Sequence, residues 1–139
     1  MPLKVYHGTI KEYLPEIKEN EKIETSVGTF DDEGVFLTHD KDIAFMWARS
    51  YCENTFYESK LQNKYKTCTP IALEIEIPNE SLINLKPDWN RLGDIEVNND
   101  MKFKNNLTWQ ESKKMGYSEL KHITPIPYSW IKQIHLLKK

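Results

Sequence analysis

The segment from Ile71 to Ile77 constrains the fold most, because apolar and charged side chains alternate along it. Its odd-numbered positions are all isoleucine or leucine, whereas Glu74 and Glu76 fall between them, and Pro78 follows directly. Side chains on a strand point to opposite faces in turn, so this pattern predicts a strand with one buried face and one wet face. It is the clearest strand in the sequence.

A second strand is expected at the N-terminus and ends in a polar motif. Leu3 and Val5 alternate with more polar neighbours, which places His7 on the same inward face at the end of the strand. Gly8 has no Cβ and would let a ligand approach the backbone closely, and Thr9 can cap the next element. These residues predict a ligand-binding site at the end of the strand. A core histidine followed by an ordinary turn is the alternative.

Two helices are expected in the first half of the chain. Thr9–Glu12 has the form of a capping box, and a short helix is predicted to begin near Pro15 and end near Asn20, which tolerates the left-handed C-terminal position. Asp40 can cap the second helix, whose apolar residues recur at helical spacing and predict a buried stripe. The stripe consists of Ile43, Ala44, Trp47, Ala48 and Tyr51.

The remaining elements are short. Gly34–Thr38 reads as a strand, Thr108–Glu111 as a second capping box whose helix stops at Gly116, and 117–121 and 130–137 as further strands. Mixed short strands and helices without a βαβ repeat predict an α+β fold around a mainly antiparallel sheet. The 139 residues fit one domain, spanning 1–139.

Composition narrows the class of protein. A net charge of -2, from 19 basic and 21 acidic residues, gives no general attraction to nucleic acid or to an acidic membrane. Arg49 and Arg91 are the only arginines, which argues against a site built on several guanidinium groups. Cys52 and Cys68 suggest neither a zinc site nor a disulfide scaffold, and no segment reads as a signal peptide or membrane span. A cytoplasmic protein without a metal is therefore expected.

The order of the motifs resembles a known family. A strand ending in His7-Gly8-Thr9 precedes the strand Gly34–Thr38 and the alanine-rich helix after it, and Glu119 stands ahead of the segment Pro125–Ile131. This order resembles the ADP-ribosyltransferase superfamily, on the diphtheria-toxin-like and poly(ADP-ribose) polymerase-like side, whose motif triad is His, Tyr and Glu. The resemblance covers most of the chain. It implies split, mainly antiparallel sheets with short flanking helices around an NAD cleft.

The resemblance also implies an activity and a set of site residues. The activity is mono-ADP-ribosyl transfer from NAD, as co-substrate, to a macromolecular acceptor with release of nicotinamide. Glu119 and His7 would be the catalytic residues, with His7 holding a ribose hydroxyl as an orienting group. The residues that would bind NAD are His7, Gly8, Thr9, Phe36 and Tyr51. Phe36 stands where the family usually has a tyrosine that stacks on nicotinamide, so a π-face is kept and a hydroxyl is lost.

The acceptor is left open by the sequence. Trp109 and Tyr117 would lie on the acceptor side and could stack on a nucleobase or pack on a protein. Tyr117 occupies a place where arginine-modifying members carry Gln or Glu, which argues against arginine as the acceptor. Because of the lysines at 102, 104, 113 and 114, nucleic acid is a candidate acceptor as well as protein.

Four rival interpretations exist. Glu74 and Glu76 form an E-x-E pair like that of arginine-specific transferases, but their alternation with isoleucine indicates a solvated face. A non-catalytic module that binds NAD or an ADP-ribosylated partner is favoured by Phe36. An RNA 2'-phosphotransferase of related fold would need more arginines than the chain has, and an interaction protein is the choice if the His-Gly-Thr motif is chance.

Overall fold

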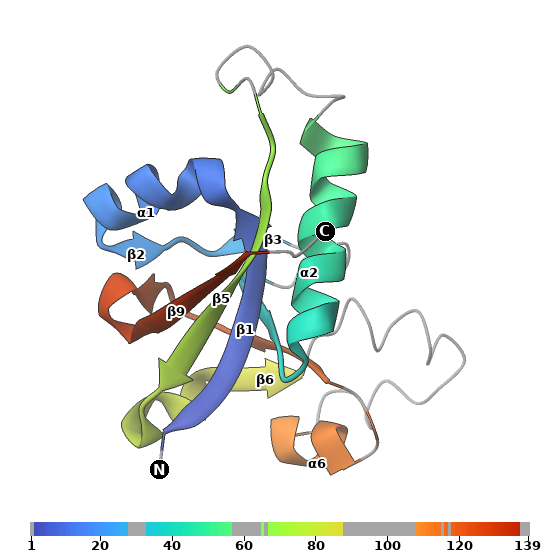
Figure 1. The fold of residues 1–139 in the computed structure, drawn as a ribbon. Coiled ribbons are helices and arrows are strands. Elements are labelled where there is room, and N and C mark those ends of the chain that lie inside the picture. Colours follow the sequence, from blue (N-terminus) through green and yellow to red (C-terminus); the bar gives the residue numbers. More distant parts are fainter. Residues whose placement is uncertain are drawn as a thin grey trace.

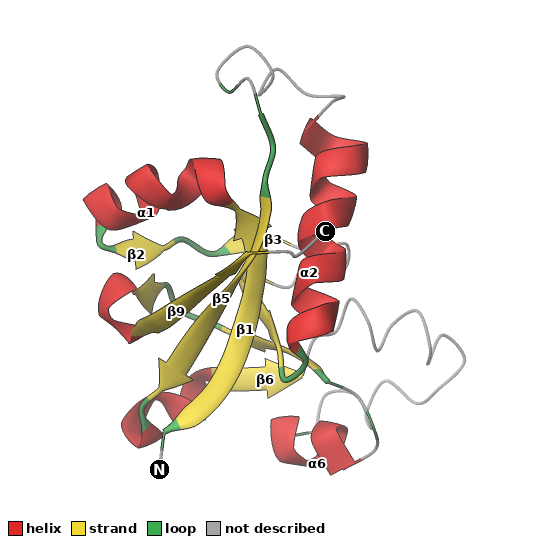
Figure 2. Cartoon of the chain, in the orientation of Figure 1, coloured by secondary structure: helices red, strands yellow, loops and turns green. Residues whose placement is uncertain are grey.

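The protein has a mixed α/β fold in which short helices flank a mainly antiparallel sheet (Figures 1 and 2). The computed structural model describes residues 2–27, 33–56, 65, 67–87, 108–114, 116 and 118–136. The strands are β1 (Leu3–Ile10), β2 (Lys22–Ile23), β3 (Ser26–Val27), β4 (Glu33–Thr38), β5 (Pro70–Ile77), β6 (Leu85–Pro87), β7 (Glu119–His122), β8 (Ile126–Pro127) and β9 (Ile131–Leu136). The helices are α1 (Leu14–Asn20), α2 (Lys41–Ser50) and α6 (Trp109–Lys114). Shorter helical turns are the 3-10 turns η1 (Lys11–Tyr13), η3 (Asn79–Asn84) and η4 (Tyr128–Trp130), and the π-helical turn η2 (Tyr51–Phe56).

The strand predicted at the N-terminus and the strand predicted at 71–77 are neighbours in the sheet. The strand order is β6-β7-β4-β1-β5-β9, with β3 paired to β4 off this path, and β2 pairs with β8 in a separate two-stranded sheet. β1 and β5 run antiparallel along their whole length, from Leu3 opposite Ile77 to Ile10 opposite Pro70. The strand predicted from the alternation at 71–77 is therefore confirmed, and so is the antiparallel character of the sheet.

The main core lies on the face that carries the odd-numbered side chains of β1 and β5. Val5, Leu37, Leu73 and Ile75 are fully buried there. Residues Leu14 and Ile17 of α1 pack against this cluster, whereas Ala44 and Phe45 of α2 pack with Ala72 and Tyr6. Figure 1 accordingly shows α1 and α2 on opposite sides of β1. Each buried aliphatic side chain of this kind contributes roughly 1.5–3 kcal/mol to folding.

The first predicted capping box does not form. No side chain caps the turn that follows β1, and α1 begins one residue before Pro15. Glu12 instead binds a distant segment, because its carboxylate accepts hydrogen bonds from the Thr69 amide at 2.8 Å, the Thr69 hydroxyl at 2.9 Å and the Thr67 hydroxyl at 2.7 Å. Glu21, with φ of 62°, takes the left-handed position that the sequence suggested for Asn20.

The other two predicted caps are confirmed. Asp40 Oδ1 accepts a hydrogen bond of 2.8 Å from the amide of Asp42 at the start of α2. Thr108 Oγ1 accepts one of 3.1 Å from the Glu111 amide, and Glu111 Oε1 accepts one of 3.2 Å from the Thr108 amide. Gly116 follows α6 with a positive φ of 95°, as expected of a residue that stops a helix.

The buried stripe predicted for α2 is only partly correct. Ala44 and Ala48 are buried together with Phe45, which the stripe did not include. The other predicted members turn toward a cavity described below: Ile43, Trp47 and Tyr51. The helix therefore has two apolar faces, one against the sheet and one against the cavity.

A disulfide joins Cys52 to Cys68, contrary to the prediction for the two cysteines. Their Cα atoms lie 5.7 Å apart although 16 residues separate them in sequence. Pairing of β1 with β5 brings residue 68, just before β5, close to Ile10, and Cys52 packs on Ile10 at the end of α2. The prediction failed because the irregular sequence between the two cysteines gives no sign of this proximity.

Candidate functional site

Every residue that the sequence assigned to catalysis or NAD binding lines one cavity, which has a volume of about 810 Å³. Sites for small molecules and cofactors measure roughly 300–1,000 Å³. The predicted site residues that line the cavity are His7, Gly8, Thr9, Phe36, Tyr51 and Glu119. The other lining residues are Tyr13, Glu16, Ile17, Asn20, Lys22, Ile23, Glu24, Ser26, Ile43, Met46 and Trp47.

The cavity opens where β1 and β4 diverge. Tyr6 of β1 pairs with Thr38 of β4. On the other side of β4, Glu119 of β7 also lies opposite Thr38. Strict alternation along these strands would place Glu119 and His7 on opposite faces of the sheet. Both nevertheless line the cavity, whose walls come from α1 and β2 on one side and from α2 on the other. The cavity thus lies in the gap between β1 and β4, where residues of both faces meet.

His7 joins the two diverging strands by a side-chain hydrogen bond. Its Nδ1 lies 2.8 Å from the carbonyl oxygen of Phe36. Because a carbonyl only accepts, Nδ1 carries the proton and donates. Burial lowers the pKa of His7 below its ordinary value, and the bond to Phe36 opposes this only in part. The imidazole is therefore neutral near pH 7, and its Nε2 lone pair remains an acceptor.

Gly8 is needed for a reason that the sequence did not suggest. A Cβ at this position would overlap the carbonyl oxygen of Ala44 and lie 2.9 Å from its carbonyl carbon. Glycine thus permits a close approach of the α2 backbone here, and the approach of a ligand stays a prediction. Gly8 still lines the cavity, through its backbone.

Glu119 begins β7 at the same end of the cavity. It lies opposite Thr38 in the strand pairing, and its Oε2 accepts a hydrogen bond of 3.1 Å from the amide of Ser118. The strand order places β4 between β1 and β7, so Glu119 and His7 flank the strand that carries Phe36. We call this group, His7, Phe36 and Glu119, the carboxylate end of the cavity.

Tyrosines form the other end. The hydroxyl groups of Tyr13 and Tyr51 share a hydrogen bond, and the Tyr65 hydroxyl donates one of 2.8 Å to Glu16 Oε1. The Tyr13 ring meets the Tyr51 and Tyr65 rings edge-on at centroid distances of 6.0 and 5.8 Å. Burial, followed by the bond to Tyr51, raises the pKa of Tyr13, so its phenol is neutral. We call Tyr13, Glu16 and Tyr51 the tyrosine end of the cavity.

The order of contacts along β1 shows that the two ends are separate. Gly8 packs on Ala44 near the start of α2, and Ile10 packs on Cys52 beyond the end of that helix. The three residue-to-residue steps from His7 to Ile10 span roughly 10 Å of strand. An elongated ligand fits this arrangement better than a compact one.

Several lining residues were missed by sequence reasoning. Tyr13 and Glu16 were not considered as site residues, and Trp47 was assigned to a core stripe. Met46, 58% exposed, was not considered. The available signal was the excess of apolar residues around α2, which has more of them than one buried face requires.

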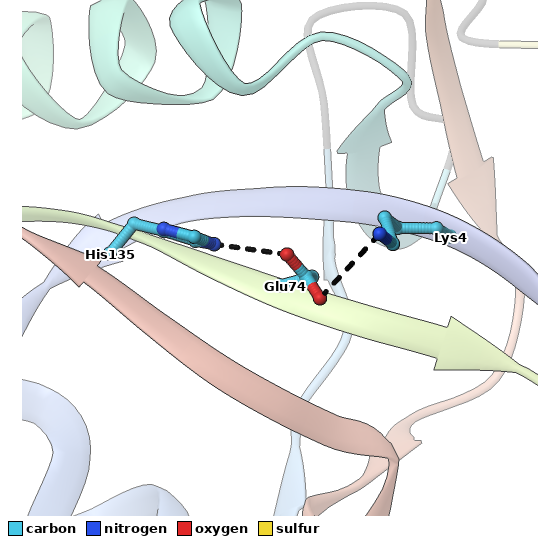
Figure 3. A network of polar contacts seen from close by, with 3 residues as sticks. All are labelled: Lys4, Glu74 and His135. Carbon is cyan, nitrogen blue, oxygen red and sulfur yellow. Dashed lines mark hydrogen bonds and ion pairs between the residues drawn. The ribbon is translucent and has the colours of Figure 1, made fainter.

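The rival carboxylates lie outside the cavity lining. Glu74 accepts a hydrogen bond of 3.0 Å from His135 Nε2 and lies 3.9 Å from Lys4 Nζ (Figure 3). Its side chain is only 14% exposed, so Glu74 is less solvated than the wet face predicted for this strand. β1 and β9 flank β5 and supply the two partners.

The acceptor-side residues gain no support from the described structure. Trp109 packs against the main core and against the ring of His39, 6.0 Å away, and does not line the cavity. Tyr117 lies outside the described residues, as do lysines 102 and 104. Lys113 and Lys114 are exposed on α6.

Two further findings bear on function. Within the described part of the chain, no cluster of three or more His, Cys, Asp or Glu side chains could hold a metal ion. None of the described helices is long and apolar enough to cross a membrane.

His122 is structural, because its buried ring bonds to Ser81 Oγ at 2.8 Å and to the carbonyl oxygen of Thr124 at 2.7 Å.

Comparison with known proteins identifies no relative. The chain matches no protein-family model, no curated protein and no solved structure.

Two partly buried histidines, His7 and His39, predict how stability depends on pH. Burial lowers the pKa of His7, and burial together with the charge of Lys113 lowers that of His39 to about 4 from an ordinary 6.5. Between these pKa values the unfolded chain binds more protons, so the free energy of unfolding should fall as the pH drops from 6.5 toward 4. Urea denaturation of wild type and His39→Gln across this range measures the effect. His39→Gln should show a shallower decline, and an identical decline would contradict the account.

Proposed function

We propose that the protein is an NAD-dependent mono-ADP-ribosyltransferase that transfers ADP-ribose to a macromolecular acceptor and releases nicotinamide. The observation that carries this proposal is the convergence of His7, Phe36 and Glu119, from three strands, on one cavity. The same three residues carry the motif resemblance. An ADP-ribosyltransferase-type split sheet around an NAD cleft belongs to the same proposal.

The proposed chemistry assigns a role to each of the three residues. Cleaving the bond between nicotinamide and ribose develops oxocarbenium-like positive charge on the sugar, which the carboxylate of Glu119 would stabilise. The neutral His7 would accept a hydrogen bond from a ribose hydroxyl at Nε2. Phe36 would stack on nicotinamide and hold the leaving group in place. The tyrosine end would receive the rest of the dinucleotide.

A non-catalytic NAD-binding module is the second candidate function. It is favoured by Phe36, since a phenylalanine keeps the stacking face and removes the hydroxyl that the family usually places there. This module would use the same cavity and the same NAD contacts. It differs in one property, because it would bind NAD without releasing nicotinamide.

The location in the cell and the kind of acceptor are also parts of the proposal. Protein and nucleic acid are both candidate acceptors. A cytoplasmic location stays a prediction from the sequence, and the disulfide between Cys52 and Cys68 counts against it because cytosolic thiol systems keep such pairs reduced.

NAD binding can be tested by thermal unfolding. A ligand that binds only the folded state at a hundredfold excess over its Kd stabilises that state by about 2.7 kcal/mol, which corresponds to a rise in Tm of several degrees. Phe36→Ala should reduce the rise, whereas Phe36→Tyr should preserve or increase it. Glu76→Gln, outside the cavity lining, is the control and should respond like wild type. An unchanged Tm of wild type in millimolar NAD would argue against both candidate functions.

A further inference from the structure

The disulfide lies directly behind the tyrosine end of the cavity. Cys52 is only 6% exposed and follows Tyr51 in the turn that continues α2. It packs on Ile10 in a cluster that also contains Tyr13, Tyr51, Tyr65 and Cys68. The bond therefore joins residues that contact the wall of the cavity.

The partner cysteine belongs to a segment that is held in place independently of the disulfide. Cys68 stands between Thr67 and Thr69, both of which donate hydrogen bonds to Glu12. The amide of Lys11 adds a bond of 2.8 Å to the carbonyl oxygen of Thr69. The segment 67–69 is thus fixed to the turn after β1, which carries Tyr13. Through the disulfide, this fixed point also secures the end of α2 that carries Tyr51.

The two ends of the cavity depend on the disulfide unequally. Tyr51 lies in the turn that contains Cys52, and Tyr13 lies in the turn to which the segment 67–69 is hydrogen-bonded. The hydrogen bond between the two tyrosine hydroxyl groups spans the same junction. The carboxylate end comes from β1, β4 and β7, which are held by strand pairing and by the bond from His7 to Phe36. Breaking the disulfide should loosen the first end and leave the second in place.

We propose that the Cys52–Cys68 pair is a redox control on ligand binding, in which the disulfide keeps the tyrosine end formed and its reduction lowers the affinity for the dinucleotide. This inference rests on the proposed function in so far as NAD is taken as the ligand. The control would restrict binding to oxidising conditions. Turnover at saturating NAD should change less than affinity, because Glu119 and His7 lie at the other end.

The chemical step is an ordinary thiol–disulfide exchange with a dithiol as the reductant. A thiolate of the dithiol attacks the sulfur of Cys68, which is more exposed than Cys52, and the bond between the two cysteine sulfurs breaks. The second thiol of the reductant then displaces Cys68. Two electrons and two protons pass to the protein, giving two thiols, and the dithiol becomes a cyclic disulfide.

The test compares the Kd for NAD of the oxidised and the dithiothreitol-reduced full chain by calorimetry, with free thiols counted by maleimide labelling. We expect a roughly tenfold weaker Kd after reduction, restored by reoxidation, which corresponds to about 1.4 kcal/mol. A Cys52→Ala/Cys68→Ala double variant should bind as weakly as the reduced protein and be indifferent to dithiothreitol. Tyr51→Phe keeps the disulfide but loses the hydroxyl bond to Tyr13, and it should weaken binding in the oxidised form.

Hydrogen exchange of the same samples distinguishes a failure of the redox control from a failure of the proposed function. Reduction should speed exchange in 51–54 and leave β7 unchanged. Equal Kd values with both forms folded would overturn the redox control and leave the proposed function intact. Loss of far-UV circular dichroism on reduction would also overturn it, since the disulfide would then support the whole fold. No NAD binding by the oxidised protein would overturn the proposed function, and unchanged exchange in 51–54 would in addition overturn the redox control.

Discussion

Replacing Glu119 by glutamine is expected to slow nicotinamide release by ~10²–10³-fold, or about 3–4 kcal/mol, while leaving the affinity for NAD nearly unchanged. The reason is that the carboxylate would interact with positive charge that exists mainly in the transition state. Glutamine has almost the same shape and can still accept the bond from the Ser118 amide through its side-chain oxygen. Parallel measurement of kcat by nicotinamide quantification and of Kd by calorimetry distinguishes a loss of rate from a loss of binding.

The structure identifies which carboxylate is the proper control for this variant. Glu74 is unsuitable, because removing its charge would break a partly buried contact with His135 and Lys4. Glu76 lies on the same strand, outside the cavity lining, and Glu76→Gln should leave both kcat and Kd unchanged. If Glu76→Gln abolishes nicotinamide release while Glu119→Gln does not, the catalytic carboxylate has been assigned wrongly.

Replacing Gly8 by alanine is expected to have the largest effect on stability. The added Cβ would overlap the backbone carbonyl of Ala44, and a backbone group within a helix cannot turn aside as a side chain can. α2 would have to move away from β1, at a cost of about 3 kcal/mol or a fall in Tm of roughly 10 °C. Thermal and urea unfolding monitored by circular dichroism measure this cost.

Gly116→Ala is the matched control for that substitution. A Cβ at Gly116 would meet no atom within 4 Å, but the positive φ of 95° makes alanine strained there. The cost of that strain is about 1 kcal/mol. A Gly8→Ala variant no less stable than Gly116→Ala would mean that α2 does not pack on Gly8 as described.

Local patterns predicted the parts of the fold that depend on neighbouring residues. The alternation at 71–77 predicted β5 because one face of that strand is covered by the main core. Asp40 and Thr108 cap helices as expected because a cap needs only a side chain two or three residues from the amide that it binds. Thr9 failed as a cap because Glu12, its expected partner, binds Thr67 and Thr69 across the fold.

The features that the sequence did not predict depend on contacts between distant segments. Cys52 and Cys68 meet only because β1 pairs with β5, and Gly8 is needed only because α2 crosses it. Neither relation leaves a periodic trace in the chain. His7, Phe36 and Glu119 lie on strands that local patterns predicted, although β1 continues to Ile10 and does not end at His7 as expected. Of the tyrosine end, Tyr51 was named from the sequence, whereas Tyr13 and Glu16 were missed because they belong to a helical segment far from Tyr51 in the chain.

Quantifying nicotinamide released from labelled NAD by the purified protein, with whole lysate as the source of acceptor, tests the central claim most directly. A transferase should release nicotinamide in step with labelled ADP-ribose appearing on macromolecules, and Glu119→Gln should do neither at a comparable rate. Treating the product with protease or with nuclease then identifies the acceptor as protein or nucleic acid. Intact NAD after incubation, with binding demonstrated under the same oxidising conditions, would contradict the transferase and leave the binding module.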